Sequence, residues 1–256
     1  MTLTSLKLML TVLILLAACI PGIWTFYQIA KHMEIKPFSE LNYPVGESLA
    51  SGIFLGAGLL HMLPDAALSF TEAGYRYPFP FLMAGISFLF LLLLEHIAMA
   101  LKHRYSQLVD SITLLTVTML SIHALLEGAA VGLALSFATA LLISIAILTH
   151  KGVASFALSI QLHRGHLSFT ARILAFSLFA IMTPIGILCG DWILSSTPHS
   201  PLLTPIFSSL AAGTFLYIGT LHGLGRASLI RHCCNMKEFF VMLFGFSLMA
   251  VVAIWT

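Results

Sequence analysis

The chain has 256 residues, of which 59% are hydrophobic and only 9% are charged. Soluble domains carry about 25% charged residues, so this composition excludes a soluble enzyme, a disordered chain and a nucleic-acid binder. The formal net charge of +2 is too small to indicate a polyanionic partner. The composition therefore predicts a polytopic membrane protein whose surroundings are a lipid bilayer.

Eight apolar segments are long enough to cross about 30 Å of hydrocarbon as helices, which takes about 20 residues each. They are Leu6–Ile29, Val45–Phe70, Pro78–Leu101, Val109–Ser136, Ala140–Leu162, Ala171–Leu194, Pro205–Gly225 and Phe239–Trp255. A transmembrane β-barrel is excluded, because barrel strands alternate polar and apolar residues whereas these segments are continuously apolar. The connections are short, so we expect one all-α membrane domain over residues 1–256.

Basic residues in the connections predict the orientation, because cytoplasmic loops are rich in lysine and arginine. Nine of them lie in odd-numbered connections: Lys31, Lys36, Lys102, Arg104, Arg164, Arg172, Arg226, Arg231 and Lys237. Only Lys7 and Arg76 lie on the opposite side. This bias predicts that both termini are extracytoplasmic.

The first apolar segment has a second interpretation as a cleaved secretory signal. Lys7, the apolar run that follows it and the sequence Leu16–Cys19 resemble a signal with a lipoprotein-type cleavage site. The apolar run continues to Phe26, which is long for a signal core and favours a retained helix. Cleavage would leave seven spans. No organelle signal is recognised, so we expect a bacterial inner membrane or a plasma membrane.

Ionisable residues in the fourth and fifth segments need an explanation, because each costs at least ~2.5–3.5 kcal/mol near the bilayer centre. His123 and Glu127 are four residues apart and share one helix face. His150 lies at a similar depth by residue count, and a tight Phe137–Thr139 connection would make the two helices antiparallel neighbours. The three side chains are therefore expected to converge near the midplane.

Two imidazoles and one carboxylate suit a borderline divalent ion such as zinc, with iron, manganese, cobalt and cadmium as alternatives. A polar cluster that joins two helices without metal is the other interpretation. Lys151, beside the cluster, is expected to pair with Glu127 and to take the place of a second cation. Gly128 and Gly132 have GxxxG spacing, which predicts the close approach of a neighbouring helix.

Further ionisable residues lie on either side of the central cluster. His61 and Asp65 flank a proline in the outer half of the second segment, where we expect a kinked helix and an entrance path. The predicted exit path near the cytoplasmic ends contains Glu95, His96 and His222. Each of these residues is also explained as an interfacial polar group that reaches water.

Two motifs carry a resemblance to a known family. The fourth-segment sequence HALLEGAAVGL, His123–Leu133, resembles the HxxxEGxAxGL signature of the ZIP (Zrt/Irt-like) divalent-metal transporters. The fifth-segment sequence HKGVASFALS, His150–Ser159, is similar to the form found in the subgroup of smaller animal zinc transporters. Gly56–Ala66 and Ala211–Tyr217 also match, and the resemblance covers all eight segments.

The resemblance implies a transporter that carries zinc or a similar ion into the cytoplasm by alternating access. It implies His123, Glu127 and His150 as ligands, in a mobile bundle that slides against a static one within a homodimer. Many family members have polar or acidic residues where this chain has Ala124 and Ala154. We therefore expect one bound ion rather than two.

An intramembrane metal-dependent hydrolase is the alternative function, in which the same three residues would hold zinc and activate water. The sequence contains no HExxH, HxxxH or GxSxG motif, which argues against hydrolysis. A proton-relay or scaffold protein would use the same ionisable residues without metal. We expect a transporter with no catalytic residues and no cofactor, for which the divalent ion is the substrate.

Overall fold

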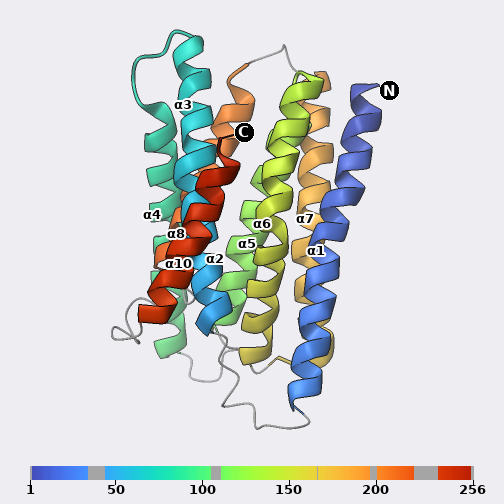
Figure 1. The fold of residues 1–256 in the computed structure, drawn as a ribbon, viewed down its shortest axis with the longest axis vertical. Helices are drawn as coiled ribbons and strands as arrows, with labels where there is room; N and C mark the ends of the chain where they lie inside the picture. The colour runs from blue at the N-terminus through green and yellow to red at the C-terminus, as the bar shows by residue number, and fades with distance from the viewer. Residues whose placement is uncertain are drawn as a thin grey trace.

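The structure is a computed structural model that describes residues 2–33, 44–104, 111–165, 167–196, 201–221 and 236–254. Within these ranges the chain forms eight helical runs that stand side by side as an upright bundle (Figure 1). The elements are α1 (Leu3–Met33), α2 (Pro44–Gly56), η2 (Ala57–Met62), α3 (Leu63–Glu72), α4 (Phe79–Arg104), α5 (Ser111–Gly132), α6 (Phe137–Arg164), α7 (Phe169–Ser196), α8 (Leu203–Thr220) and α10 (Met236–Val252). The segments α2, η2 and α3 form one continuous run, so each predicted segment contains one run.

Seven runs in the described part of the chain are long and apolar enough to cross a membrane. They are Leu3–Ile29, Pro44–Glu72, Phe79–Ala100, Thr113–Gly132, Phe137–Arg164, Phe169–Ser196 and Leu203–Thr220. The eighth helix, α10, has 17 residues, or about 26 Å at 1.5 Å per residue, and it packs along α2. The chain is therefore an all-α polytopic membrane protein. The beginning of α1 and the end of α10 lie at the same end of the bundle (Figure 1).

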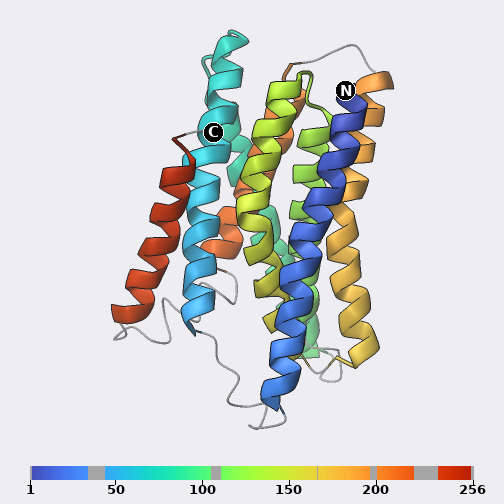
Figure 2. The ribbon, with the colours of Figure 1, turned by 45° about the vertical axis from the view of Figure 1, so that its right-hand side comes forward.

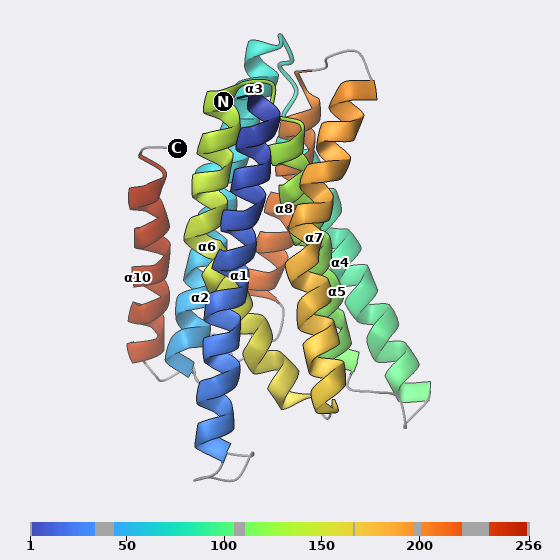
Figure 3. The ribbon, with the colours of Figure 1, turned by 90° about the vertical axis from the view of Figure 1, so that its right-hand side faces the viewer.

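The helices sort into two packed groups (Figure 2). The α5–α6 group consists of α1, α5, α6 and α7, and the α8 group consists of α2 with η2 and α3, α4, α8 and α10. The two groups meet chiefly where α5 packs on α8, with further contacts between α4 and α5 and between α2 and α6. Figure 3 shows α1 and α7 of the first group in front and α10 at the far edge of the second.

Glycines bring α5 and α7 into backbone contact. A Cβ atom on Gly128 would lie 2.2 Å from the carbonyl oxygen of Thr183, and one on Gly132 would lie equally close to another carbonyl of α7. Gly186 and Gly190 of α7 face α5 in the same way. The close approach predicted from the GxxxG spacing is confirmed, and α7 is the partner helix.

The connection between α5 and α6 differs from the prediction. The turn occupies residues 133–136, whereas we expected Phe137–Thr139. Ser136 explains the difference, because its side-chain oxygen accepts a hydrogen bond from the Thr139 N–H at 3.0 Å and thereby caps α6. Glu127 consequently lies closer to the end of its helix than the predicted boundary implied, while α5 and α6 still pack against each other.

A buried lysine joins α1 to the end of α5. Lys7 is 2% exposed, and its Nζ donates to the carbonyl oxygen of Gly132 at 2.6 Å and to Asp191 Oδ1 at 2.7 Å. A cation at a helix C-terminus pairs with an otherwise unsatisfied carbonyl and opposes the helix dipole. Lys7, which the sequence placed among the connection charges, is therefore part of the packed bundle.

The second run contains a π-helical turn just before Pro64. The Leu63 N–H donates to the carbonyl of Gly58, five residues earlier, instead of four. Proline lacks an N–H, and its ring conflicts with the carbonyl four residues back, so a wider turn accommodates it. The irregularity predicted at this proline is thus a π-helical turn, and it contains His61.

An ion pair joins the two helix groups at the other end of α6. Arg164, the last residue of α6, pairs through its guanidinium with the carboxylate of Glu47 in the first turn of α2. Glu47 is buried, whereas Arg164 remains partly exposed. Because α6 and α2 belong to different groups, this pair is a direct polar link between the two groups.

Candidate metal site

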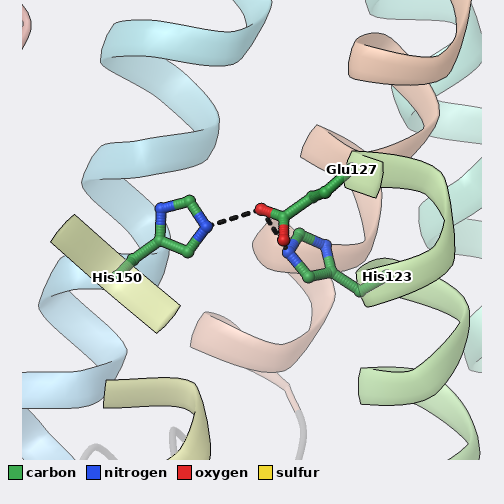
Figure 4. Close-up of side chains that lie close together, drawn as sticks. All are labelled: His123, Glu127 and His150. Atoms are coloured by element: carbon green, nitrogen blue, oxygen red, sulfur yellow. Dashed lines mark hydrogen bonds and ion pairs between the residues drawn. The ribbon is translucent and has the colours of Figure 1, made fainter. Parts of the chain in front are cut away.

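Three side chains converge between α5 and α6 (Figure 4). His123, Glu127 and His150 each offer a ligand atom within 4.8 Å of the other two, and each residue is at most 2% exposed. Glu127 Oε1 lies 2.8 Å from His123 Nε2 and 2.5 Å from His150 Nε2. The sequence singled out two residues by their i, i+4 spacing on one helix and a histidine on the neighbouring helix. The structure brings these three residues together.

The donor set suits a borderline divalent ion. Glu127 Oε2 is buried and makes no hydrogen bond with the described residues, so this oxygen can face an incoming cation. Ligand atoms in a tetrahedral site with bonds of ~2.1 Å stand about 3.4 Å apart. The carboxylate oxygen would therefore have to withdraw from the two Nε2 atoms by less than about 1 Å to admit an ion.

A cavity of about 440 Å³ reaches the site. Glu127 and His150 line it, as do His61 and Asp65 from the second helical run. His61 Nδ1 lies 2.9 Å from Asp65 Oδ2, and Asp65 is exposed. The cavity also touches Thr139 in the first turn of α6, so it extends to the end of the bundle that holds the α5–α6 turn. The predicted entrance residues therefore share one cavity with two residues of the central cluster.

Lys151 does not pair with Glu127, and this prediction was wrong. Its Nζ donates to Thr183 Oγ1 at 2.7 Å and lies 4.6 Å from the ring centre of Phe179, both on α7. Consecutive residues of a helix point about 100° apart, so Lys151 turns toward α7 when His150 faces α5. The idea that this ammonium takes the place of a second cation required a contact between Lys151 and Glu127. The structure does not show that contact.

The predicted exit residues have different surroundings. Glu95 is buried and accepts a hydrogen bond from the Tyr217 hydroxyl of α8. His96 is exposed, and its Nδ1 lies 2.9 Å from the carbonyl oxygen of Leu92 in its own helix. His222 lies outside the described residues. The structure thus does not bring Glu95 and His96 to one point.

Two residues of α8 that the sequence did not single out contact the cluster. Thr214 Oγ1 lies 2.5 Å from His123 Nδ1. The Phe215 ring stacks on His123 with centroids 3.6 Å apart and meets His150 edge-on at 4.7 Å. Both residues fall within Ala211–Tyr217, which carried the family resemblance without a role for any side chain.

Comparison with known proteins gives one consistent result. The family model described as "ZIP Zinc transporter" matches residues 4–112 and 106–253. Zinc transporter ZIP2 of Mus musculus is 27% identical over 80% of this chain and 83% of its own length, and zinc transporter ZIP1 of Homo sapiens is 28% identical over 78% and 74%. Protein zntD of Dictyostelium discoideum is 38% identical over 53% of this chain and 20% of its own length. Since the family model matches nearly the whole chain, this protein belongs to the ZIP family of zinc transporters.

Proposed function

We propose that this ZIP-family protein binds zinc at His123, Glu127 and His150 and carries it across the membrane into the cytoplasm by alternating access. The observation that carries the proposal is the convergence of these three buried side chains at the wall of a cavity. Burying such groups in a membrane-spanning bundle is costly unless they serve a partner. Iron, manganese and cadmium suit the same donor set and are further candidate substrates.

The cavity supports a route toward the site. An ion entering at Asp65 and His61 would exchange part of its water shell for a carboxylate and an imidazole. It would then reach Glu127 and His150 in the same cavity. Exit past Glu95, His96 and His222 stays a prediction.

The division into two helix groups supports a sliding movement. The site lies on α5 and α6 in one group, and α8 of the other group lies against it. A shift of the α5–α6 group along the α8 group would carry the site from one side of the bilayer toward the other. Extracytoplasmic termini, inferred from the basic residues of the connections, and a homodimer complete the proposal.

Metal binding at this cluster must displace the proton of a hydrogen bond. The hydrogen bond between Glu127 Oε1 and His150 Nε2 needs a proton on one of these two atoms. A divalent ion uses the same lone pairs, so its binding releases this proton. Transport of zinc is therefore expected to be accompanied by proton release at the site.

Uptake of radioactive zinc into proteoliposomes tests the proposal. Glu127→Gln keeps the size of the side chain and removes the anionic ligand, so saturable uptake should largely disappear. His199→Ala, which lies between the sixth and seventh predicted segments, serves as the control and should transport like the wild type. Equal uptake by all three proteins would show that the assigned site is wrong.

A further inference from the structure

The orientation of His123 is set by α8, a helix of the opposite group. His123 Nδ1 lies 2.5 Å from Thr214 Oγ1 and 3.2 Å from the carbonyl oxygen of Ala211. The Phe215 ring stacks on the imidazole with an interplanar angle of 28°. The hydrogen bond fixes the direction in which Nδ1 points, and the stacking contact fixes the tilt of the ring plane.

These contacts also fix which nitrogen of His123 carries hydrogen. The Thr214 hydroxyl donates to the carbonyl of Ala211 at 2.6 Å, so its own hydrogen is already used. The Ala211 carbonyl can only accept. His123 Nδ1 therefore has two acceptors as neighbours and must be the N–H donor. In a neutral imidazole this leaves the lone pair on Nε2, which faces Glu127.

We propose that Thr214 is a positioning residue that holds His123 in the tautomer and orientation required for metal binding. The inference rests on the proposed function, because it assigns His123 Nε2 as a zinc ligand. Histidine ligands in proteins commonly donate their second nitrogen to a nearby acceptor, which fixes the ring and raises its basicity. Here the acceptor is a hydroxyl that its own helix has oriented through the hydrogen bond to Ala211.

This contact depends on the relative position of the two helix groups. His123 belongs to α5 and Thr214 to α8, so sliding of the α5–α6 group separates them. The hydrogen bond is then made only in the arrangement described here, in which the cavity reaches the site. Zinc is accordingly held more tightly in this arrangement than after sliding, which favours release on the other side.

The test compares Thr214→Val, Thr214→Ser and the control Thr220→Val in the full-length protein. Valine has the shape of threonine without the hydroxyl, and serine retains the hydroxyl. Thr220 lies on the same helix, and its hydroxyl donates to the carbonyl of Leu216 in that helix. Zn²⁺ affinity is measured in detergent by competition with a fluorescent chelator, and KM and Vmax are measured by uptake into proteoliposomes.

Thr214→Val should weaken Zn²⁺ binding about tenfold, the lower end of the range for lost outer-shell partners, because the Ala211 carbonyl stays available. KM should rise by a similar factor with little change in Vmax, since release does not need the hydroxyl. Thr214→Ser and Thr220→Val should bind like the wild type. If the valine variant does not purify as a monodisperse protein, Thr214→Ala replaces it.

Two results would overturn the inference: wild-type affinity in Thr214→Val, or an affinity in Thr214→Ser as weak as that of the valine variant. The second result would mean that packing, and not the hydroxyl, holds His123. Failure of the proposed function has a different signature, because Glu127→Gln would then bind and transport Zn²⁺ like the wild type. A normal loss in Glu127→Gln together with unchanged Thr214→Val would refute only the role of Thr214.

Discussion

Replacing Gly128 by alanine should force α5 away from α7 and disturb the site next to it. The added Cβ would lie 2.2 Å from the carbonyl oxygen of Thr183, which is backbone and cannot rotate away. Ordinary contact begins at 3.4 Å, so the helices must separate locally by about 1.2 Å. Glu127 is the preceding residue, so the displacement of α5 moves it as well. The displacement is larger than the adjustment of less than about 1 Å that an ion needs from the Glu127 carboxylate.

The energetic consequence has two opposing contributions. Inserting an extra carbon into a packed interface typically costs about 1–3 kcal/mol. Alanine in place of a helical glycine gains up to about 1 kcal/mol through helix propensity. A clash with rigid backbone lies toward the upper end of this cost. We therefore expect Gly128→Ala to lower the free energy of unfolding by about 2 kcal/mol.

Gly85→Ala is the matched control for this experiment. Gly85 lies within α4, and a Cβ atom there would meet nothing within 4 Å, so only the propensity gain applies. Thermal unfolding of the purified proteins in detergent should show a lower Tm for Gly128→Ala and an unchanged or higher Tm for Gly85→Ala. Zn²⁺ affinity should fall only in Gly128→Ala. Equal Tm and affinity in the two variants would refute the reasoning.

Two other predictions concern the ion pair between the helix groups and the effect of pH. Arg164→Met leaves the buried Glu47 carboxylate without its guanidinium and should destabilise the fold by about 3 kcal/mol. Adding Glu47→Gln should restore part of the Tm, whereas equal Tm values in the single and double variants would contradict this account. Lowering the pH from about 7.5 to about 5.5 should weaken Zn²⁺ binding, because protons compete for the imidazole lone pairs. A chelator-competition titration at each pH checks this, and an affinity that does not fall would be evidence against histidine ligation.

Much of the fold follows from local sequence properties. Each continuously apolar segment forms one helical run, because a chain in a bilayer must satisfy its backbone hydrogen bonds within the segment. His123 and Glu127 share a face because they are one turn apart, and His150 meets them because a short turn makes α5 and α6 neighbours. Membership in a transporter family also decides against the intramembrane hydrolase considered from the sequence.

The features that sequence reasoning missed depend on packing between distant elements. Thr214 and Phe215 reach His123 only because α8 lies against α5, and no local pattern encodes that contact. Lys151 was assigned to Glu127 because both are charged, whereas the direction of its side chain sends it to α7. The start of α6 could have been found, since Ser136 is a favoured N-cap residue.

The π-helical turn at Ala57–Met62 decides which charges the mouth of the cavity carries. Each residue of an α-helix advances by 100° around the axis, and a π-helical turn inserts one additional residue. Everything beyond it is therefore rotated by about 100° relative to an uninterrupted helix. Asp65 and Glu72 lie beyond the turn and line the cavity. In a regular helix the same two carboxylates would point to a different neighbour, and the cavity would present a less acidic rim to a cation.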